Sequence, residues 1–261
     1  MNVSELKVSA GSANSIFGFP DQYRRRARLK PAILEVLPIL LVFGVGAFSA
    51  LGGLDPVSRF GVAGIGTLLS SLGLTALLEQ LGRDQGKGKE PALWARWGGA
   101  PTTRMLRHRD TLFCNPVTRS RYHAKLQSLM PGVQIPSAAD EAADPAAADL
   151  VYEACTKFLI SKTRDQRSFP LVFEENVNYG FRRNLWGMRA AGFLLSLLGT
   201  CFAGALFAFS RWGSPISVAW LFVLIVDASL LTWWSIRITP IWVFIPAKAY
   251  AERLMEALES L

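Results

Sequence analysis

Histidine and cysteine are scarce in this chain, and charge is nearly missing from four long stretches of it. The 261 residues include two His and three Cys, and neither type recurs at the spacing of a zinc site or a disulfide framework. The HExxH and GxSxG motifs of zinc proteases and serine hydrolases do not occur either. We therefore predict no metal site, no cofactor, no disulfide and no catalytic residues, and we consider an enzyme the weaker hypothesis.

The stretches without charge are the most informative feature of the sequence. Residues 36–54 and 60–78 give 19 uncharged residues each, residues 190–210 give 21, and residues 212–236 give 25 with one charge, Asp227. A helix of about 20 apolar residues crosses a bilayer, and lipid leaves helix as the only conformation that satisfies the backbone. The predicted fold is an all-α integral membrane protein with four transmembrane helices, two plus two, flanking a mostly helical cytosolic domain.

The distribution of polar residues divides the chain further. Basic residues outnumber acidic ones by sixteen to eleven over residues 83–186, whereas each short loop between paired spans holds one Arg. Basic charge near spans marks the cytoplasmic side, so both termini and the middle are predicted to be cytoplasmic. The predicted parts are a cytosolic N-terminal tail (1–30), a first transmembrane pair (31–82), a cytosolic helical domain (83–186), a second transmembrane pair (187–239) and a cytosolic amphipathic helix (240–261).

Helix signals recur within the predicted cytosolic domain. Asn115 and Asp144 each precede a proline, which is the pattern of a capping residue followed by the first helical position. The helix after Asp144 is predicted over about 145–166, with a buried face made of Leu150, Cys155, Phe158 and Leu159. Residues 82–89 are Gly-rich and charged and are predicted to be a linker, and residues 169–173 to be a strand or an extended connector.

Asp227 is the strongest single candidate for function. An acidic residue in the middle of a span is energetically unfavourable by at least about 2.5–3.5 kcal/mol, and such residues tend to be functional. One hypothesis is a proton or cation site that lines a pore. The alternative is a protonated side chain that bonds a hydroxyl group on a neighbouring helix, with Ser196, Thr200, Ser70 and Ser71 as the candidate partners.

Small side chains recur every four residues along the third predicted span. Such a stripe allows the backbone of another helix to approach closely. The partner helix could belong to the same chain or to a second copy in a homo-oligomer, and both options stay open at this stage. The predicted packing residues are Gly192, Ser196, Thr200, Gly204 and Ala208, and the candidate facing residues are Gly44, Gly46, Thr67, Ser70, Ser71 and Gly73.

Basic residues also cluster at the start of the middle region. Arginine binds phosphate and carboxylate groups through two parallel hydrogen bonds, so a nucleotide, a lipid headgroup or another anionic ligand is one hypothesis. Nearby acidic residues, Asp110 and Asp165 among them, could instead neutralise the cluster. The candidate anion-binding residues are Arg104, Arg107, His108, Arg109 and Arg121.

Two segments carry a resemblance to known proteins. The run 98–103 (GGAPTT) and the run 174–187 (EENVNYGFRRNLWG) resemble a group of uncharacterised bacterial inner-membrane proteins. The layout of few spans and a helical cytosolic part is similar to that of small membrane effectors of bacterial anti-phage systems. The resemblance implies a multi-pass location in the bacterial inner membrane and assigns no activity.

The hypothesis that follows is a non-enzymatic membrane protein. Its cytosolic domain would sense a partner protein or an anionic ligand and alter the helix bundle, as a pore-forming or membrane-disrupting effector would. The first alternative is a membrane enzyme that acts on a lipid or phosphorylated substrate at the cytoplasmic face. The second is a scaffold that recruits cytosolic proteins to the lipid bilayer.

Overall fold

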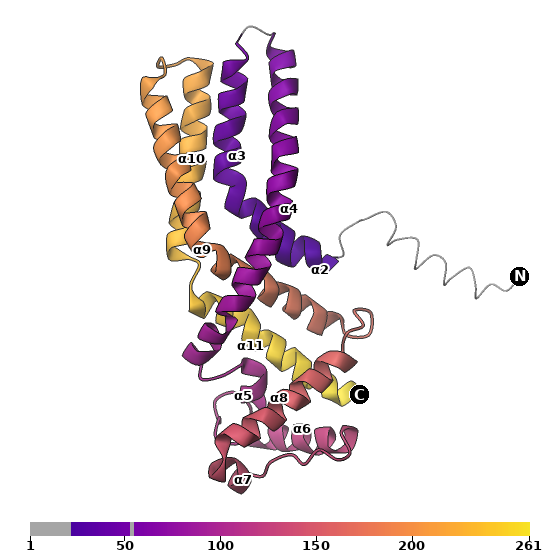
Figure 1. Cartoon of the computed structure of the whole chain (residues 1–261). Coiled ribbons are helices and arrows are strands. Elements are labelled where there is room, and N and C mark those ends of the chain that lie inside the picture. Colours follow the sequence, from indigo (N-terminus) through magenta and orange to yellow (C-terminus); the bar gives the residue numbers. More distant parts are fainter. Residues whose placement is uncertain (1–21, 53–54) are drawn as a thin grey trace, which may run out of the picture.

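The computed structural model describes residues 22–52 and 55–261. The described residues form helices and no strand, which confirms the all-α prediction. Figure 1 shows a bundle of long helices at one end, a group of short helices at the other, and α11 running between them. The elements are α2 (Gln22–Arg24), η1 (Arg25–Leu29), α3 (Lys30–Ala50), α4 (Pro56–Arg96), α5 (Pro101–Leu106), α6 (Pro116–Leu129), α7 (Ala138–Ala143), α8 (Pro145–Lys162), α9 (Pro170–Phe209), α10 (Pro215–Ile236), α11 (Pro240–Glu256) and η2 (Ala257–Ser260).

Proline and a capping side chain together determine where most of these helices begin. Seven helices from α4 to α11 start on a proline, whose missing N–H is not needed at the first helical position. Asn115 and Asp144 accept backbone N–H bonds at the starts of α6 and α8, as predicted. Asp55, Ser214 and Thr239 do the same for α4, α10 and α11.

Among the described residues, three helices are long and apolar enough to cross a membrane. They are the segment Arg24–Ala50, which includes α3, and the helices α9 and α10. In Figure 1 the N-terminal part of α4 lies beside α3 in the same bundle. The residues that pack in this bundle include Ala203, Trp220 and Val223, which have at most 5% exposure.

Two helices run through the predicted domain boundaries without a break. The predicted linker 82–89 is wrong, because these residues are an internal part of the 41-residue helix α4. The predicted strand or connector at 169–173 is wrong too, because α9 begins at Pro170 and continues for 40 residues. Tertiary packing offsets the low helix propensity of glycine, and the close contacts of Gly82 and Gly86 with α9 are its source here.

The short helices and the C-terminal helix share one hydrophobic core. Tyr152, Cys155 and Leu159 from α8 pack in this core with Leu254 and Leu258 from the C-terminal segment. The predicted buried face of α8 is correct for Cys155 and Leu159, which have 0% exposure, but wrong for Leu150, which is 68% exposed.

A second core joins this region to the bundle. Its buried members include Leu93 of α4, Leu185 and Met188 of α9, Trp234 of α10 and Val243 of α11. The N-terminal tail predicted over 1–30 is only partly described, since residues 1–21 lie outside the described ranges. Its last residues are helical, and Ala27 is fully buried among these helices.

Candidate functional site

The arginines of the predicted anion site are all engaged with groups of the protein itself. Arg104 bonds the Asp110 carboxylate and the Trp97 carbonyl. Arg107 forms a bidentate pair with Asp149, with both N···O distances at 2.8 Å. Arg121, from α6, donates to the Glu259 carboxylate at 2.7 Å.

Glu141 of α7 is the buried centre of this polar network. Only 1% of its surface is exposed, and it accepts hydrogen bonds from the His108 N–H, the Arg109 N–H and the Tyr152 hydroxyl at 2.7–3.0 Å. The Arg109 guanidinium adds an ion pair at 2.9 Å. Burial alone would raise the pKa of this carboxyl, but the bonds to its charged form outweigh that effect and lower the pKa to about 2.

The two histidines contact each other beside this network. Their ring centroids lie 4.8 Å apart, and each ring faces a backbone carbonyl, that of Pro136 for His108 at 3.2 Å and that of Leu106 for His123 at 2.8 Å. Burial lowers the pKa of His123, so this ring is neutral in the folded protein at neutral pH and its Nε2–H donates to Leu106. No group of three or more potential metal ligands was found among the described residues.

This geometry favours a structural role for the basic cluster. An added anion would have to displace Asp149 or Asp110 from bonds that are already made. Of the two acidic residues named as possible neutralising partners, Asp110 does pair with Arg104, whereas Asp165 accepts a bond from the Ser168 hydroxyl instead. Arg104, Arg107, His108, Arg109 and Arg121 thus hold the short helices together, and the arrangement adds no support to the anion-binding hypothesis.

Asp227 occupies the opposite kind of environment, in the middle of the bundle. It is fully buried, and neither carboxyl oxygen has a hydrogen-bond partner among the residues that the structure describes. A Cβ atom added to Gly199 of α9 would meet Oδ2 of Asp227 at 2.4 Å and Cβ of Pro38 at 3.1 Å. Asp227 thus lies where α3, α9 and α10 meet.

The two predicted hydroxyl partners on α9, Ser196 and Thr200, form no hydrogen bond with this carboxyl. The Thr200 hydroxyl donates to the Ser196 carbonyl of its own helix at 2.7 Å. The Ser196 hydroxyl is fully buried and has no partner in the described part of the chain. The side chains of Ser70 and Ser71 lie outside what the structure describes.

A second buried carboxylate lies near this level of the bundle. Glu35 of α3 is 2% exposed, and its Oε2 atom has no partner within the described ranges. It precedes Pro38 by three residues, which places the two on one face of α3. Ser196 and Asp227 are thus buried at the seam between α3, α9 and α10, and Glu35 is buried about one helical turn from Pro38, the residue of α3 at this seam.

The predicted small-residue stripe follows only part of the real contact face. Gly192 meets the Trp234 ring, and Ser196 is buried, but Ala208 is exposed. Within the uncharged part of α9, the buried small residues are instead Gly192, Ser196, Gly199 and Ala203. A strict spacing of four advances about 40° per step around a helix of 3.6 residues per turn, so its far end turns away from the partner.

The partners of the stripe within this chain are α3 and α10. Gly204 lies 3.6 Å from Leu224 of α10 when a Cβ atom is added. Of the predicted facing residues, Gly44 lies against α4 rather than α9, since a Cβ atom added to it would be 3.5 Å from the Thr67 hydroxyl, and one added to Gly46 would be 4.0 Å from the Trp220 ring of α10. Nothing lies within 4 Å of Gly73 among the described atoms.

The long helices α4 and α9 cross in direct backbone contact. A Cβ atom on Gly187 would lie 2.5 Å from the backbone nitrogen of Gly86, and one on Gly86 would lie 2.6 Å from the side-chain oxygen of Asn184. Only glycine allows such an approach. The crossing lies between the apolar bundle and the short helices (Figure 1).

Polar bonds fasten this crossing on each side. Lys89 donates to the Gly187 carbonyl at 2.6 Å. Arg183 pairs with Glu90 at 3.1 Å. Asn184 donates to the Ala27 carbonyl of η1 at 2.7 Å. Three segments far apart in sequence are therefore held together at one level.

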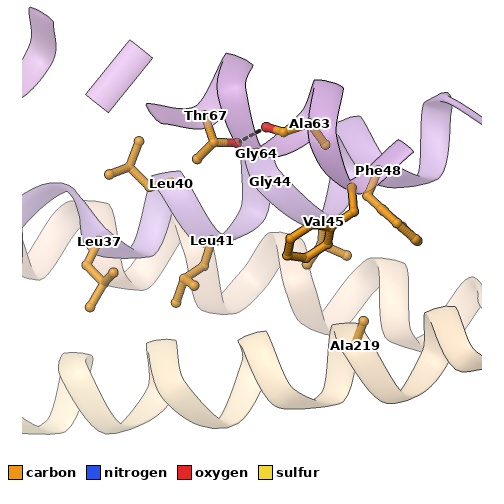
Figure 2. Close-up of a pocket in the computed structure, with 11 residues that line it drawn as sticks. Leu37, Leu40, Leu41, Gly44, Val45, Phe48, Ala63, Gly64, Thr67 and Ala219 are labelled. Atoms are coloured by element: carbon orange, nitrogen blue, oxygen red, sulfur yellow. Dashed lines mark hydrogen bonds between the residues drawn. The ribbon is translucent and has the colours of Figure 1, made fainter. Parts of the chain in front are cut away.

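One cavity of the bundle has an almost entirely apolar lining. It measures about 680 Å³ and lies between α3, α4 and α10. Figure 2 shows leucine side chains and Val45 around it, and the one hydroxyl that it labels, Thr67, bonded to the Ala63 carbonyl at 2.8 Å. An apolar cavity at this depth suits hydrocarbon and offers nothing to a polar ligand.

Sequence reasoning missed Glu35, Gly86, Glu141, Gly187 and Gly199. Gly86 was assigned to a linker because charge and glycine surround it, and Gly199 falls outside the spacing of four. Glu35 lies one residue before the uncharged stretch. Two signals in the sequence could have indicated some of these residues. One is the acidic Glu35 at the edge of a span, and the other is the presence of glycine on both long helices, at Gly86 and Gly187.

Comparisons of the chain with protein-family models, with curated proteins and with solved structures gave no match.

Proposed function

We propose that this protein is a non-enzymatic, multi-pass membrane protein in which a helical domain outside the bilayer controls the packing of the helix bundle inside it. The domain comprises α5 to α8 with α11 and η2, and it responds to a partner protein or ligand. The bundle comprises α3, α10 and the apolar parts of α4 and α9, which gives four spans. The effect on the membrane is a change in permeability through this bundle.

The contact between Gly86 and Gly187 is the observation that carries the proposal. Both α4 and α9 pass through this point as unbroken helices of 41 and 40 residues. Since an α-helix rises about 1.5 Å per residue, α4 extends ~39 Å from Gly86 to Phe60. A tilt of about 5° at the crossing would move that end by about 3 Å, which is the scale of known helix shifts in switching proteins.

The buried carboxyl groups favour an exchange of the bundle between a closed and an open arrangement. Asp227 and Glu35 are buried with oxygen atoms that have no bonding partner in the described chain. A closed seam of this kind leaves polar groups unsatisfied, and separation of the helices would let water or an ion reach them. The domain would then set how often the seam opens.

The orientation in this proposal follows the basic charge of the chain. The domain and both termini lie on the cytoplasmic side of a bacterial inner membrane. The native thiols of Cys114 and Cys155 are buried, so cysteine labelling needs exposed positions. Cysteines introduced at Lys157 and at Trp212, in a background with Cys201→Ala, should be labelled from the cytoplasmic and the outer side respectively. The reverse pattern would contradict the orientation.

Widening the crossing tests the coupling. Gly187→Ala places a methyl group against the backbone of α4, whereas Gly88→Ala adds the same group where nothing described lies within 4 Å. Spin labels on cysteines at Phe60 and Phe209, both exposed, report the distance between the far ends of α4 and α9. The background carries Cys201→Ala, because the native Cys201 is exposed as well. We expect Gly187→Ala to shift this distance by a few ångström and to change ion flux in reconstituted vesicles, because the two long helices act as levers.

Gly88→Ala is the matched control and should leave both readouts unchanged. The buried thiols of Cys114 and Cys155 do not compete for the label, since burial raises their pKa values, that of Cys155 to about 11. An unchanged distance and unchanged flux in folded Gly187→Ala protein would contradict the coupling.

A further inference from the structure

A second cavity, where the bundle meets the domain, has a mixed lining. It measures about 640 Å³, and its wall is formed by α4, α9 and the end of α10. Lys89, Arg189 and Trp186 lie on this wall together with Phe193 and Leu194. Cationic groups therefore adjoin an apolar surface within one cavity.

The two cations of this cavity differ from the arginines of the domain. The Lys89 ammonium donates to the Gly187 carbonyl, and the Arg189 guanidinium donates to the Trp234 and Ser235 carbonyls at 3.3 and 2.8 Å. Neither group has a carboxylate within 4 Å in the described part of the chain. An ammonium has three N–H donors and a guanidinium five, so two and three of them respectively stay available.

The cavity lies at the level where the hydrocarbon core of a bilayer would begin. The uncharged part of α9 extends from Ala190 to its end at Phe209, and twenty residues of helix span about 30 Å, the thickness of the hydrocarbon core. Arg189 directly precedes that part. The Trp186 ring, 5.6 Å from the Arg189 guanidinium, lies where tryptophan is enriched in membrane proteins.

The cavity places cationic side chains next to an apolar surface, which is the combination that a phospholipid requires. We propose that this cavity binds an anionic phospholipid, with the phosphate held between Lys89 and Arg189 and an acyl chain along Phe193 and Leu194. Guanidinium and ammonium groups are suited to phosphate oxygens. Phe193 and Leu194 are 37% and 54% exposed and present an apolar surface on the bilayer side of the cations.

The lipid would adjoin the crossing of α4 and α9. Lys89 already bonds the Gly187 carbonyl of that crossing, and Arg189 bonds the last carbonyl groups of α10. A bound headgroup would thus bridge three helices at the membrane border. This inference does not depend on the proposed function, because a lipid can occupy the cavity whether or not the bundle changes state.

Native mass spectrometry of the full-length protein tests the assignment. The detergent-solubilised protein is mixed with equal amounts of phosphatidylglycerol and phosphatidylcholine, and the bound lipids are counted. We expect about fivefold more phosphatidylglycerol adducts, since charge-assisted bonds form with its net negative headgroup. In Lys89→Gln/Arg189→Gln protein the ratio should fall to near one.

Matched variants separate the site from general charge. Lys157→Gln/Arg211→Gln removes the same charge from exposed positions elsewhere and should keep the preference. Lys89→Gln alone leaves the Arg189 bonds to α10 intact, so it should fold normally and lower the ratio in part. A lipid ratio equal to that of the wild-type protein in both Lys89 variants would overturn the proposal. So would the absence of any preference in the wild-type protein.

A free phosphate ion is the other source of the same chemistry. Inorganic phosphate at millimolar concentration should not displace the lipid, because it has no chain to place along Phe193 and Leu194. Displacement by inorganic phosphate would show that the cavity recognises the anion alone and would overturn the assignment to a lipid.

Discussion

Glu141 and Asp227 are both acidic side chains with at most 1% exposure, but they differ in the number of hydrogen bonds that they accept. Glu141 lies among the short helices and accepts four hydrogen bonds, two of them from the backbone and the guanidinium of Arg109. Asp227 lies in the bundle with no partner for either oxygen among the described residues. The domain satisfies its buried charge, whereas the bundle leaves a buried polar group without a bond.

This difference indicates which of the two regions is rigid and which can rearrange. A buried charge with complete hydrogen bonding rigidifies the elements that surround it, as Glu141 does for α5, α7 and α8. An unsatisfied buried group raises the free energy of the closed arrangement. The domain is thus suited to act as a rigid body, and the seam around Asp227 is suited to be the part that rearranges.

Removal of the charge at Glu141 should have the largest effect on stability. Glu141→Gln places an amide NH2 group among N–H and O–H donors, and the loss of these charge-assisted bonds is unfavourable by roughly 3 kcal/mol. Arg109 keeps its pair with Asp149 at 2.8 Å. At about 2–4 °C per kcal/mol, the melting temperature in detergent should fall by roughly 10 °C. Glu153→Gln, at an exposed position of α8, is the control. Equal melting temperatures for the two variants would show that the network around Glu141 is not essential to the domain.

Overpacking of the seam should have the next largest effect. Gly199→Ala forces a methyl group against Asp227 and Pro38, and overpacking of this kind destabilises by about 1–3 kcal/mol. Gly73→Ala adds a methyl group where nothing described lies within 4 Å and should be neutral or slightly stabilising. Thermal unfolding of both variants checks this expectation. A stable Gly199→Ala protein would mean that the three helices separate easily at this level.

Replacement of Asp227 by asparagine should change stability less and activity more. Asn keeps the size of the side chain but has no acidic proton, so Asp227→Asn should insert and fold with a stability change below about 1 kcal/mol. We expect it to lose proton or cation flux in reconstituted vesicles if the wild-type protein conducts. Flux at the wild-type level in Asp227→Asn protein would exclude a role for this carboxyl in conduction.

The smallest effect concerns the pH dependence of the domain. The pKa of His123 is lowered by burial, so the unfolded chain binds a proton near pH 6.5 that the folded chain does not. Stability should therefore fall as the pH drops below about 6.5. A second loss should follow between about pH 4.5 and 2, where Glu141 is protonated. Melting curves of His123→Gln protein should lack the first loss, and an unchanged pH profile would contradict this assignment.

The sequence predicted the candidate site only where one residue differs clearly from its neighbours in the chain. Asp227 was found because a charge within an apolar stretch stands out, and its burial is confirmed. The arginines from Arg104 to Arg121 were found as a cluster, but the sequence could not show that Asp149 and Glu259 pair with them. Those acidic residues lie 42 and 138 positions away from their partners, and such pairing depends on how the helices pack.

Local chemistry in the sequence determined the helix starts and the apolar lengths, since a capping side chain, a proline and a run of nonpolar residues act through their immediate neighbours. The tertiary structure alone decided that Gly82 and Gly86 continue a helix, because contact with Met188 and Asn184 of α9 offsets the low helix propensity of glycine there. It also decided which face of α9 is buried, since the position of α3 and α10 selects Gly199 over Ala208. The packing of distant helices, which no local pattern encodes, accounts for both outcomes.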